Sequence, residues 1–517
     1  MRALGRLPPL AAFLRNLTGW RRVSAAALFG VFAALAFAPI NAVPVFWVSF
    51  PALVFLLQGA KSMREAFIIG WAFAFGLMLL GLYWIAASMF VDIAAFWWAV
   101  PLSVCGLPLV FGLYYGAGMA VAWRIGCRGL EGVLTVALMW FLSDYVRGHA
   151  FSGFPWNLEG YGWSGLLPML QITSVAGIYG LTLLTLIASC LPALLARGGA
   201  MGRWVVCASL LCLAACGFWG QWRLTEATAK TVPEVRLRLV QPNVDQALKW
   251  VADEREKNFE QLLDLSSQPG LEPVTHIIWP ETAATFYLAE DARRRQEVAA
   301  HTPLNGSVLT GVIRRSTDEN EHLHFYNSLI AIDSLARIDA GYDKHHLVPF
   351  GEYIPYRSVI PLRPLVNLGV DFTPGDGVRT LRVAGLPPFS PLVCYEVIFP
   401  GDVAAQEDRP EFLLNVTNDG WYGHTAGPYQ HFASARVRSV EEGLPLVRAA
   451  NTGISGVVDG YGRITAELQL GASGYLDADL PVALPQTFFS KNGDRPVWAL
   501  FGFFGATAAL LGLRKRK

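Results

Sequence analysis

Three polar residues in the second half of the chain have the types and spacing needed for nucleophilic chemistry. Glu281 follows a strand-like apolar run, Lys344 opens a segment that contains two histidines, and Cys394 ends another short apolar strand. Cys394 is the only cysteine between Arg223 and Asn492, whereas the other six precede Arg223 in apolar stretches. A thiol is mostly protonated at neutral pH, so it needs a nearby base or cation to become a nucleophile. A carboxylate, an amine and a thiol at the ends of strands therefore predict an activated nucleophile.

The composition indicates that this chemistry takes place at a membrane. The 517-residue chain is 53% hydrophobic and only 16% charged, whereas about a quarter of the residues in soluble chains are charged. The formal net charge of +1 lacks the basic excess that nucleic-acid binding requires. The length of the chain predicts at least two domains.

The apolar excess is concentrated in the N-terminal part of the chain, where long apolar runs follow one another with short breaks. Runs of this length can cross a bilayer, and we expect eight transmembrane helices. They lie at residues 23–40, 43–60, 66–89, 93–123, 131–147, 168–196, 203–222 and 497–513. An alternative is that the first run is a cleaved signal sequence, because Ala34-Leu35-Ala36 resembles a cleavage site.

Positive charges between these runs predict the orientation of the chain. Arginine and lysine are found before the first run, after the second, fourth and sixth runs, and after the last. The positive-inside rule then places both ends of the chain in the cytoplasm. The expected domains are a membrane domain with seven helices at 1–222, an extracytoplasmic catalytic domain at 223–492, and a last transmembrane helix with a basic cytoplasmic tail at 493–517.

The polar region alternates strand-like and helix-like segments. Period-two and period-3.6 patterns distinguish the two kinds of segment. We expect strands at 235–240, 308–313, 328–332, 411–417 and 454–458, and helices at 253–265, 289–301 and 427–442. Such alternation predicts an α/β layered fold in which helices cover the sheets.

Residues 349–372 interrupt this alternation. The segment mixes many apolar side chains with Pro355, Pro361 and Pro364, and proline disrupts both helices and inner strands. One interpretation is a buried irregular connection. The other is a loop whose apolar side chains enter the lipid boundary beside the active site.

Three motifs resemble the carbon–nitrogen hydrolase (nitrilase) superfamily. They are Trp279-Pro280-Glu281, the segment 344–352 that reads Lys-His-His-Leu-Val-Pro-Phe-Gly-Glu, and Cys394-Tyr395-Glu396. Together with the membrane region and the last apolar run, they are similar to the apolipoprotein N-acyltransferase family over nearly the whole chain. This resemblance implies a four-layer αββα sandwich attached to a polytopic membrane domain.

The resemblance also implies a reaction and a location. An acyl chain would move from a phospholipid, typically phosphatidylethanolamine, to the α-amino group of the diacylglyceryl-modified N-terminal cysteine of an apolipoprotein. This is the last step of bacterial lipoprotein maturation. The enzyme would lie in the inner membrane with its catalytic domain on the periplasmic side.

The resemblance further implies roles for single residues. Glu281 matches the general base, Lys344 the oxyanion-stabilising lysine, and Cys394 the nucleophile that would carry a thioester. Glu352 matches a further essential glutamate that holds the lysine. The remaining matched or neighbouring positions are Tyr395 and Glu396 beside the nucleophile, and Trp250, Asn327, Phe350 and Tyr353 as candidate substrate-binding residues.

The chemistry of these residues agrees with such roles. Glu281 can accept the proton of the thiol if an enclosed site raises its pKa. Lys344 and the backbone N–H after Cys394 can stabilise the oxyanion that forms when an ester carbonyl is attacked. An amine would then attack the thioester, which gives a ping-pong order of substrates.

Other interpretations of these residues and of the whole chain remain open. Cys394 could be a small apolar core residue, Glu281 a carboxylate at a helix start, Lys344 a surface cation and Glu352 a structural ion-pair partner. A membrane-tethered amidase would use the same three groups, and a transporter or lipid-binding scaffold could carry a degenerate hydrolase domain. Intramembrane charge is sparse, which disfavours a coupled transporter.

No metal and no cofactor are expected. Four histidines in the polar region invite a metal interpretation: His345, His346, His424 and His431. Their spacing does not match that of known zinc sites.

Overall fold

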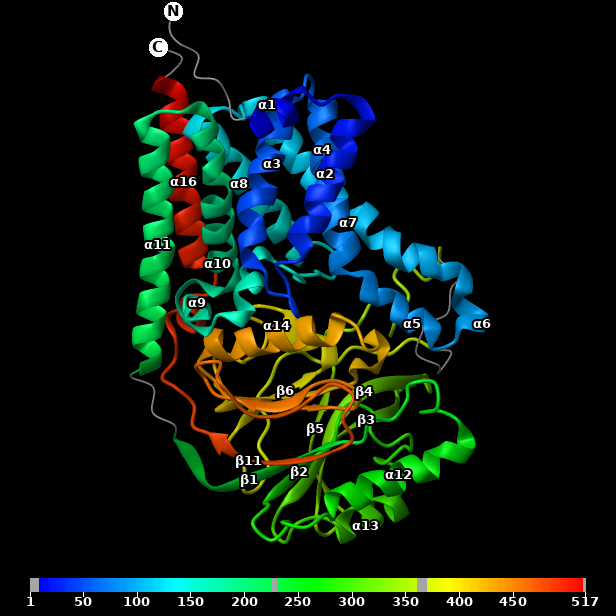
Figure 1. Ribbon diagram of the computed structural model, residues 1–517. Coiled ribbons are helices and arrows are strands. Elements are labelled where there is room, and N and C mark those ends of the chain that lie inside the picture. The colour runs from blue at the N-terminus through cyan, green and yellow to red at the C-terminus, as the bar shows by residue number, and fades with distance from the viewer. Residues whose placement is uncertain (1–8, 226–229, 360–369, 515–517) are drawn as a thin grey trace, which may run out of the picture. The chain divides into compact units, whose positions relative to one another are not determined.

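The structure is a computed structural model that describes residues 9–225, 230–359 and 370–514 (Figure 1). The chain divides into two compact units. One comprises Met1–Met89, Phe96–Ala227 and Thr487–Lys517, and the other comprises Phe90–Ala95 and Thr228–Gln486.

The first unit is helical. Its helices are α1 (Pro9–Asn16), α2 (Gly19–Ala34), α3 (Phe46–Gly59), α4 (Met63–Gly81), α7 (Val100–Ile125), α8 (Gly129–His149), α9 (Leu167–Leu170), α10 (Thr173–Cys190), α11 (Ala200–Thr225), α15 (Phe488–Asn492) and α16 (Arg495–Arg514). Two short helices, α5 (Ala87–Phe90) and α6 (Ile93–Phe96), lie at the sequence boundaries of the two units.

Within the described ranges, six helical stretches are long and apolar enough to cross a membrane. They are Met63–Gly81, Ile93–Ile125, Gly129–His149, Thr173–Arg197, Ala200–Thr225 and Arg495–Arg514, and they correspond to six of the eight predicted runs. The first two runs form shorter helices, α2 with 16 residues and the stretch Val43–Gly59. At 1.5 Å per residue, α2 is about 24 Å long, which is less than a hydrocarbon core of about 30 Å. The predicted number of eight helices is therefore not confirmed.

A buried ion pair in α8 also holds a loop of this unit. The Arg147 guanidinium lies 3.1 Å from Oδ1 of Asp144, and both side chains are almost fully buried. Arg147 also donates to the main-chain oxygens of Phe154 at 2.6 Å and Trp156 at 2.8 Å. The arginine thus satisfies both a buried carboxylate and two loop carbonyls.

The second unit contains two β-sheets. Strands β1 (Thr231–Gln241), β2 (His276–Ile278), β3 (Ser307–Thr317), β4 (Leu323–Asp333), β5 (Ile338–Asp343) and β11 (Gly474–Pro481) form a six-stranded sheet in the order β11-β1-β2-β3-β4-β5. Strands β6 (Phe389–Val393), β7 (Phe412–Thr417), β8 (Leu446–Ala450), β9 (Ser455–Val458) and β10 (Ile464–Leu468) form a five-stranded sheet in the order β10-β9-β8-β7-β6. Strands β1, β2 and β3 pair in parallel in the first sheet, and β6, β7 and β8 pair in parallel in the second.

The two sheets share one apolar core, and helices cover their outer faces (Figure 1). In β1, Leu237 and Leu239 face this central core, whereas Val240 packs on the other side with α12 (Ala252–Ser266) and α13 (Ala292–Ala300). This alternation is the period of a strand buried on both faces. Helix α14 (Gly427–Glu442) packs against β8 of the second sheet. The predicted four-layer αββα fold is confirmed.

All the predicted strands and helices of the polar region are present, with ends shifted by a few residues. The predicted strand ranges omitted β5, β8, β10 and β11. Strand β8 is short and wholly buried, and β10 is largely exposed, so neither shows the alternation of a half-buried strand.

Candidate active site

The three residues singled out from the sequence lie at strand ends within the second unit, and all three are buried. Glu281 follows β2, Lys344 follows β5, and Cys394 follows β6 as the first residue of the 3-10 helix η6 (Cys394–Ile398). Their exposed fractions are 7%, 1% and 6%, respectively. Ionisable groups are rarely buried without a partner, so their contacts define the site.

The Glu281 carboxylate accepts one hydrogen bond on each oxygen. Asn327 Nδ2 lies 2.7 Å from Oε1, and the Asn418 backbone N lies 2.9 Å from Oε2. Burial raises the pKa of Glu281, and the nearby positive charge of Lys344 offsets only part of this rise. Gly311 in β3 permits this placement, because a Cβ there would lie 2.5 Å from the Glu281 Cα. Hydrogen bonds thus fix the position of the Glu281 carboxyl group, and its raised pKa allows it to take up a proton.

Lys344 forms a buried ion pair with Glu352. Its Nζ lies 2.9 Å from Oε1 and 2.8 Å from Oε2 of Glu352, which also accepts from the Val348 backbone N at 2.8 Å. Asn327 Nδ2 reaches the same Glu352 Oε1 at 2.8 Å. Burial alone would lower the pKa of Lys344, but the charges of Glu352 and Glu281 outweigh it and raise the pKa. The lysine therefore remains an ammonium ion.

The Cys394 backbone adopts a left-handed conformation with φ of +54°. This region is unfavourable for a residue with a side chain and is found at functional sites. Burial raises the pKa of the Cys394 thiol, Glu281 raises it further, and Lys344 opposes the rise. The resting thiol is therefore protonated and needs a base.

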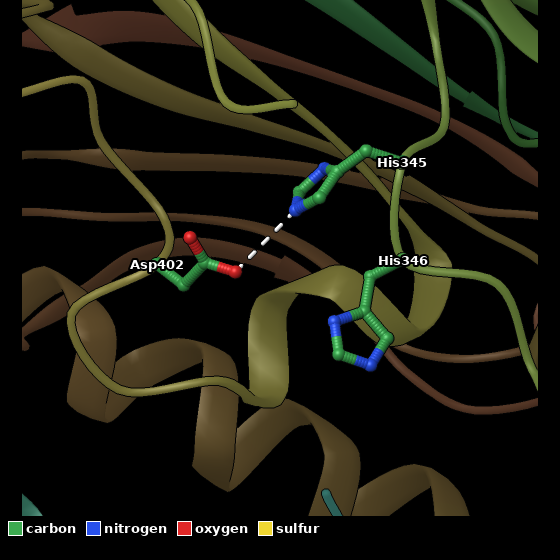
Figure 2. Close-up of side chains that lie close together, drawn as sticks. All are labelled: His345, His346 and Asp402. Atoms are coloured by element: carbon green, nitrogen blue, oxygen red, sulfur yellow. Dashed lines mark hydrogen bonds and ion pairs between the residues drawn. The ribbon is translucent and has the colours of Figure 1, made fainter. Parts of the chain in front are cut away.

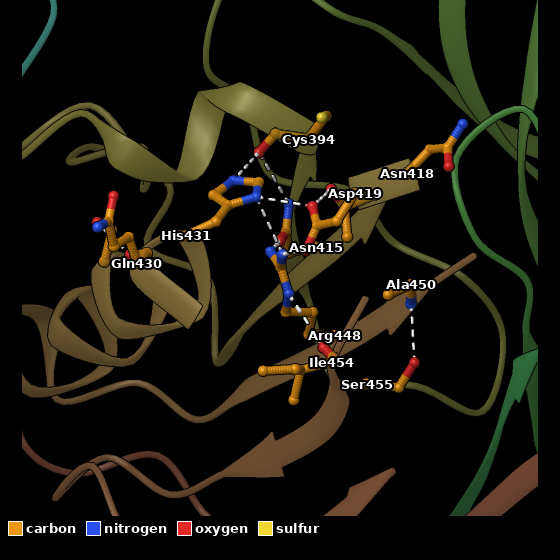
Figure 3. Close-up of polar contacts among 12 residues, drawn as sticks. Cys394, Asn415, Asn418, Asp419, Gln430, His431, Arg448, Ala450, Ile454 and Ser455 are labelled. Carbon is orange, nitrogen blue, oxygen red and sulfur yellow. Dashed lines mark hydrogen bonds and ion pairs between the residues drawn. The ribbon is translucent and has the colours of Figure 1, made fainter. Parts of the chain in front are cut away.

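A buried polar network holds the main chain of Cys394 (Figure 3). His431 Nε2 lies 3.2 Å from the Cys394 carbonyl oxygen, and its Nδ1 lies 2.8 Å from Oδ1 of Asp419. The Arg448 guanidinium lies 2.8 Å from Oδ2 of Asp419 and also donates to Asn415. Burial would raise the pKa of Asp419, but Arg448 and His431 keep it below its usual value. The Cys394 carbonyl is therefore connected through His431 to the buried ion pair of Asp419 and Arg448.

Glu396 joins the loop of Lys344 to the strand of Cys394. Its Oε1 accepts from the His345 backbone N at 2.8 Å, and its Oε2 accepts from the Val393 backbone N at 2.7 Å. His345 Nδ1 also lies 2.7 Å from Oε1. Burial alone would raise the pKa of Glu396, but the bond from His345 lowers it. Because its partners adjoin Lys344 and Cys394, Glu396 fixes the relative position of those two residues.

The structure brings His345 and His346 close to Asp402 (Figure 2), with one potential ligand atom from each within 4.8 Å of the others. His345 Nε2 lies 3.3 Å from Oδ2 of Asp402, while Nδ1 faces Glu396. Burial would lower the pKa of His345, but these two carboxylates raise it to about 9. Two ion pairs account for the position of the His345 ring, and the His346 ring stacks on Phe399 at 3.7 Å between centroids.

The candidate substrate-binding residues are placed differently from one another. Asn327 belongs to the hydrogen-bonded centre, whereas Trp250 and Tyr353 pack around a small apolar cluster formed by Ile313, Leu347 and Phe372. Phe350 is 43% exposed in a turn with φ of +63°. The Tyr395 ring packs against Phe399 at 5.1 Å and His346 at 5.8 Å between centroids.

The apolar segment 349–372 is only partly described. Its described part forms turns and a single bridge, from Pro349 to Tyr353. Tyr356 and Val359 are 71% and 78% exposed, whereas Ile354 is buried. The lipid-facing interpretation of this segment predicts that Leu362, Leu365 and Leu368 face the membrane, and these three leucines lie outside the described residues.

Sequence reasoning missed several residues of this centre. They are Lys249, Asn418, Asp419, His431 and Arg448. Asn418 and Asp419 directly follow β7, so the same rule that selected Glu281 would have selected them. Lys249, His431 and Arg448 carry no comparable signal, because only the fold brings them to the centre.

Comparison with known proteins gives matches over nearly the whole chain. The family models for the apolipoprotein N-acyltransferase N-terminal domain and for carbon-nitrogen hydrolase match residues 29–191 and 236–487. The apolipoprotein N-acyltransferase of Rhodopseudomonas palustris is 38% identical over 531 residues, which cover 99% of this chain and 98% of that protein. That of Brucella suis is 39% identical over 492 residues, which cover 91% and 92%. An amidase from Nesterenkonia sp. AN1 covers 53% of this chain and 99% of its own at 19% identity and a TM-score of 0.36, too distant to support a conclusion about the site.

Proposed function

The chain belongs to the apolipoprotein N-acyltransferase family and is an acyltransferase, and we propose that it works through a thioester on Cys394. The acyl donor is a membrane phospholipid, phosphatidylethanolamine. The acceptor is the α-amino group of the diacylglyceryl-modified N-terminal cysteine of an apolipoprotein. The observation that carries this proposal is the buried set of Glu281, Lys344 and Glu352 joined through Asn327 beside the Cys394 thiol.

In the first half-reaction, Glu281 takes the proton from the Cys394 thiol. The thiolate attacks the ester carbonyl carbon of the phospholipid, and the Lys344 ammonium and the backbone N–H after Cys394 stabilise the oxyanion. The ester C–O bond then breaks, and Glu281 returns its proton to the departing lysophospholipid oxygen. The raised pKa of Glu281 suits a group that must both accept and donate a proton.

In the second half-reaction, the lipoprotein amine attacks the thioester carbonyl. Glu281 takes a proton from the amine nitrogen, and the same donors stabilise the second oxyanion. The C–S bond breaks, the amide product forms, and the proton passes from Glu281 to the Cys394 thiolate. Each step balances without a cofactor.

Apolar side chains beside the polar centre suit a lipid substrate. Trp250 and Tyr353, which pack partly exposed on the buried cluster of Ile313, Leu347 and Phe372, offer a surface for the acyl chain, because burial of apolar area is favourable in proportion to the area removed from water. The exposed Tyr356 and Val359 enter the lipid boundary. The enzyme lies in the bacterial inner membrane with this site on the periplasmic side.

Intact-mass analysis tests the proposal. The full-length protein is incubated in detergent with phosphatidylethanolamine of one defined acyl composition. We expect a gain of one acyl chain that Cys394→Ala abolishes, and loss of that gain when a diacylglyceryl lipopeptide is added, with the acyl chain recovered on the peptide amine. Absence of the adduct, or release of the acyl chain to water as free acid with none on the peptide, would overturn the proposal.

A further inference from the structure

A second buried lysine lies at the polar centre and has no part in the steps above. Lys249 is 3% exposed, and its Nζ donates to the Glu281 main-chain oxygen at 3.2 Å. It comes just before Trp250, where a run of turns leads into α12. Among the described residues, no carboxylate lies within 4.0 Å of its Nζ. An ammonium ion buried without a direct ion-pair partner is costly, so its location calls for a functional explanation.

The charges of the centre supply that explanation. Glu281 and Glu352 contribute two negative charges when ionised, and Lys344 contributes one positive charge. Lys249 adds the second positive charge, so the net charge of these four side chains is zero only when Lys249 is an ammonium ion. Transfer of the proton from Cys394 to Glu281 moves the negative charge to sulfur and leaves the net charge of the site unchanged.

The other ionisable groups around the centre do not replace Lys249. The half-buried Tyr422 lies near Cys394 and Glu281, and its pKa is raised, chiefly by loss of solvent, so it stays uncharged. Asp419 is neutralised by Arg448, and Glu396 is paired with His345. Without Lys249, the proposed thiolate and oxyanion would form in a buried site with one excess negative charge.

We propose that Lys249 is a positioning residue that holds the main chain of Glu281 and supplies the second positive charge under which the Cys394 thiolate forms. This inference rests on the proposed function, because it takes Glu281 as the base and Cys394 as the nucleophile. Burial lowers the pKa of Lys249 to about 8, against the opposing effects of Glu281 and Cys394. Lys249 is therefore charged at neutral pH and loses its proton in mildly alkaline solution.

The test is the pH dependence of Cys394 alkylation by iodoacetamide, measured on the Cys394 peptide of the full-length protein. Lys249→Met keeps the length of the side chain and removes its charge, so the profile shifts to higher pH by at least about one unit. At a fixed pH below the midpoint, this shift makes alkylation about ten times slower. The matched control is Lys257→Met, which removes the same charge from an exposed position on α12 and leaves the profile unchanged. A folded Lys249→Met protein with the wild-type profile would overturn the inference.

Lys249→Arg keeps the test decisive if the methionine variant does not fold. In the wild type, we expect the rate of phospholipid-dependent acylation to fall at alkaline pH as Lys249 loses its proton. Arginine stays charged at all accessible pH values, so this fall should occur at a higher pH in Lys249→Arg. An unmoved decline contradicts the role of Lys249. Failure of the wild-type protein to acylate Cys394 contradicts the proposed function instead, so the two failures are distinguishable.

Discussion

Asn327 donates a hydrogen bond of 2.7 Å from Nδ2 to Oε1 of Glu281. The same nitrogen lies 2.8 Å from Oε1 of Glu352, so one amide group bridges two buried carboxylates. Carboxylates that share a site raise the pKa of one of them, and a bridging donor reduces that repulsion. Asn327 therefore links the proposed base to the glutamate that holds Lys344.

Replacement of this amide tests the link. Asn327→Leu removes hydrogen bonds to charged groups, which contribute about 1.5–3 kcal/mol each. We expect the single-turnover rate of Cys394 acylation to fall about 10- to 100-fold. Asn320→Leu, in the exposed turn before β4, is the control and should retain the wild-type rate. A wild-type acylation rate in Asn327→Leu as well as in the control would show that the bridge does not matter for acylation.

The Lys344–Glu352 pair should separate stability from catalysis. Lys344→Met leaves Glu352 as an unpaired buried carboxylate, which costs about 3–5 kcal/mol of stability, and it should slow acylation by at least about 100-fold. The double variant Lys344→Met with Glu352→Gln should recover most of the thermal stability but not the activity. Thermal unfolding and adduct formation are measured on the same samples. Normal acylation in the single variant would remove Lys344 from the mechanism.

His345 should make stability depend on pH. Its pKa is raised from 6.5 to about 9 in the folded protein, so its stabilising contribution is complete below about pH 6.5 and is lost as the pH rises through about 9. The difference in melting temperature between the wild type and His345→Gln should shrink across this range. His424→Gln, at an exposed position, is the control. A difference that grows with pH would contradict the ion-pair assignment.

The buried arginine of α8 should matter for the stability of the helical unit. Arg147→Met leaves the buried Asp144 carboxylate without its ion-pair partner and removes the hydrogen bonds from Arg147 to the carbonyls of Phe154 and Trp156, and we expect a loss of about 3–5 kcal/mol. The loss is measured as a lower unfolding temperature in detergent. Adding Asp144→Asn to this variant should restore part of it, whereas Arg124→Met at an exposed helix end should have little effect. An unchanged melting temperature for Arg147→Met would show that the ion pair does not contribute to stability.

Topology reporters test the predicted location of the catalytic domain. Fusions after Arg223 and after Lys517 should give opposite signals, because the positive-inside rule places residue 223 outside the cytoplasm and the basic end of the chain inside it. In the part of the chain that the structure describes, six helical stretches are long enough to cross a membrane, and α2 and the stretch Val43–Gly59 are shorter. A third fusion near Lys61 shows whether those two helices cross the membrane as a pair. Matching signals at Arg223 and Lys517 would contradict the predicted orientation.

Local patterns in the sequence were sufficient for the layered fold and for the residues at the ends of its strands. Glu281 and Cys394 follow the apolar strands β2 and β6, and an apolar strand that ends on a polar residue is visible within a few residues of sequence. Lys344 follows β5, which is polar and only partly buried and has no such pattern. The chain's long apolar runs likewise indicated a membrane region without any tertiary information. The predicted count of eight membrane helices is not confirmed, because the first two runs form α2 and the stretch Val43–Gly59, which are shorter than the other six helical stretches of the described residues.

Only the tertiary structure decided which groups touch. Asn418 bonds Glu281 across 137 positions of sequence, and Lys249 reaches its main chain across 32. These contacts depend on the order of strands in two sheets and on how the sheets pack face to face. A charge has no sequence periodicity of its own, so neither the contact of Lys249 with the Glu281 main chain nor the pairing of Arg448 with Asp419 could be predicted. The end of a strand is a local property of the sequence, whereas the net charge of a buried site depends on all the charged groups that the fold brings together.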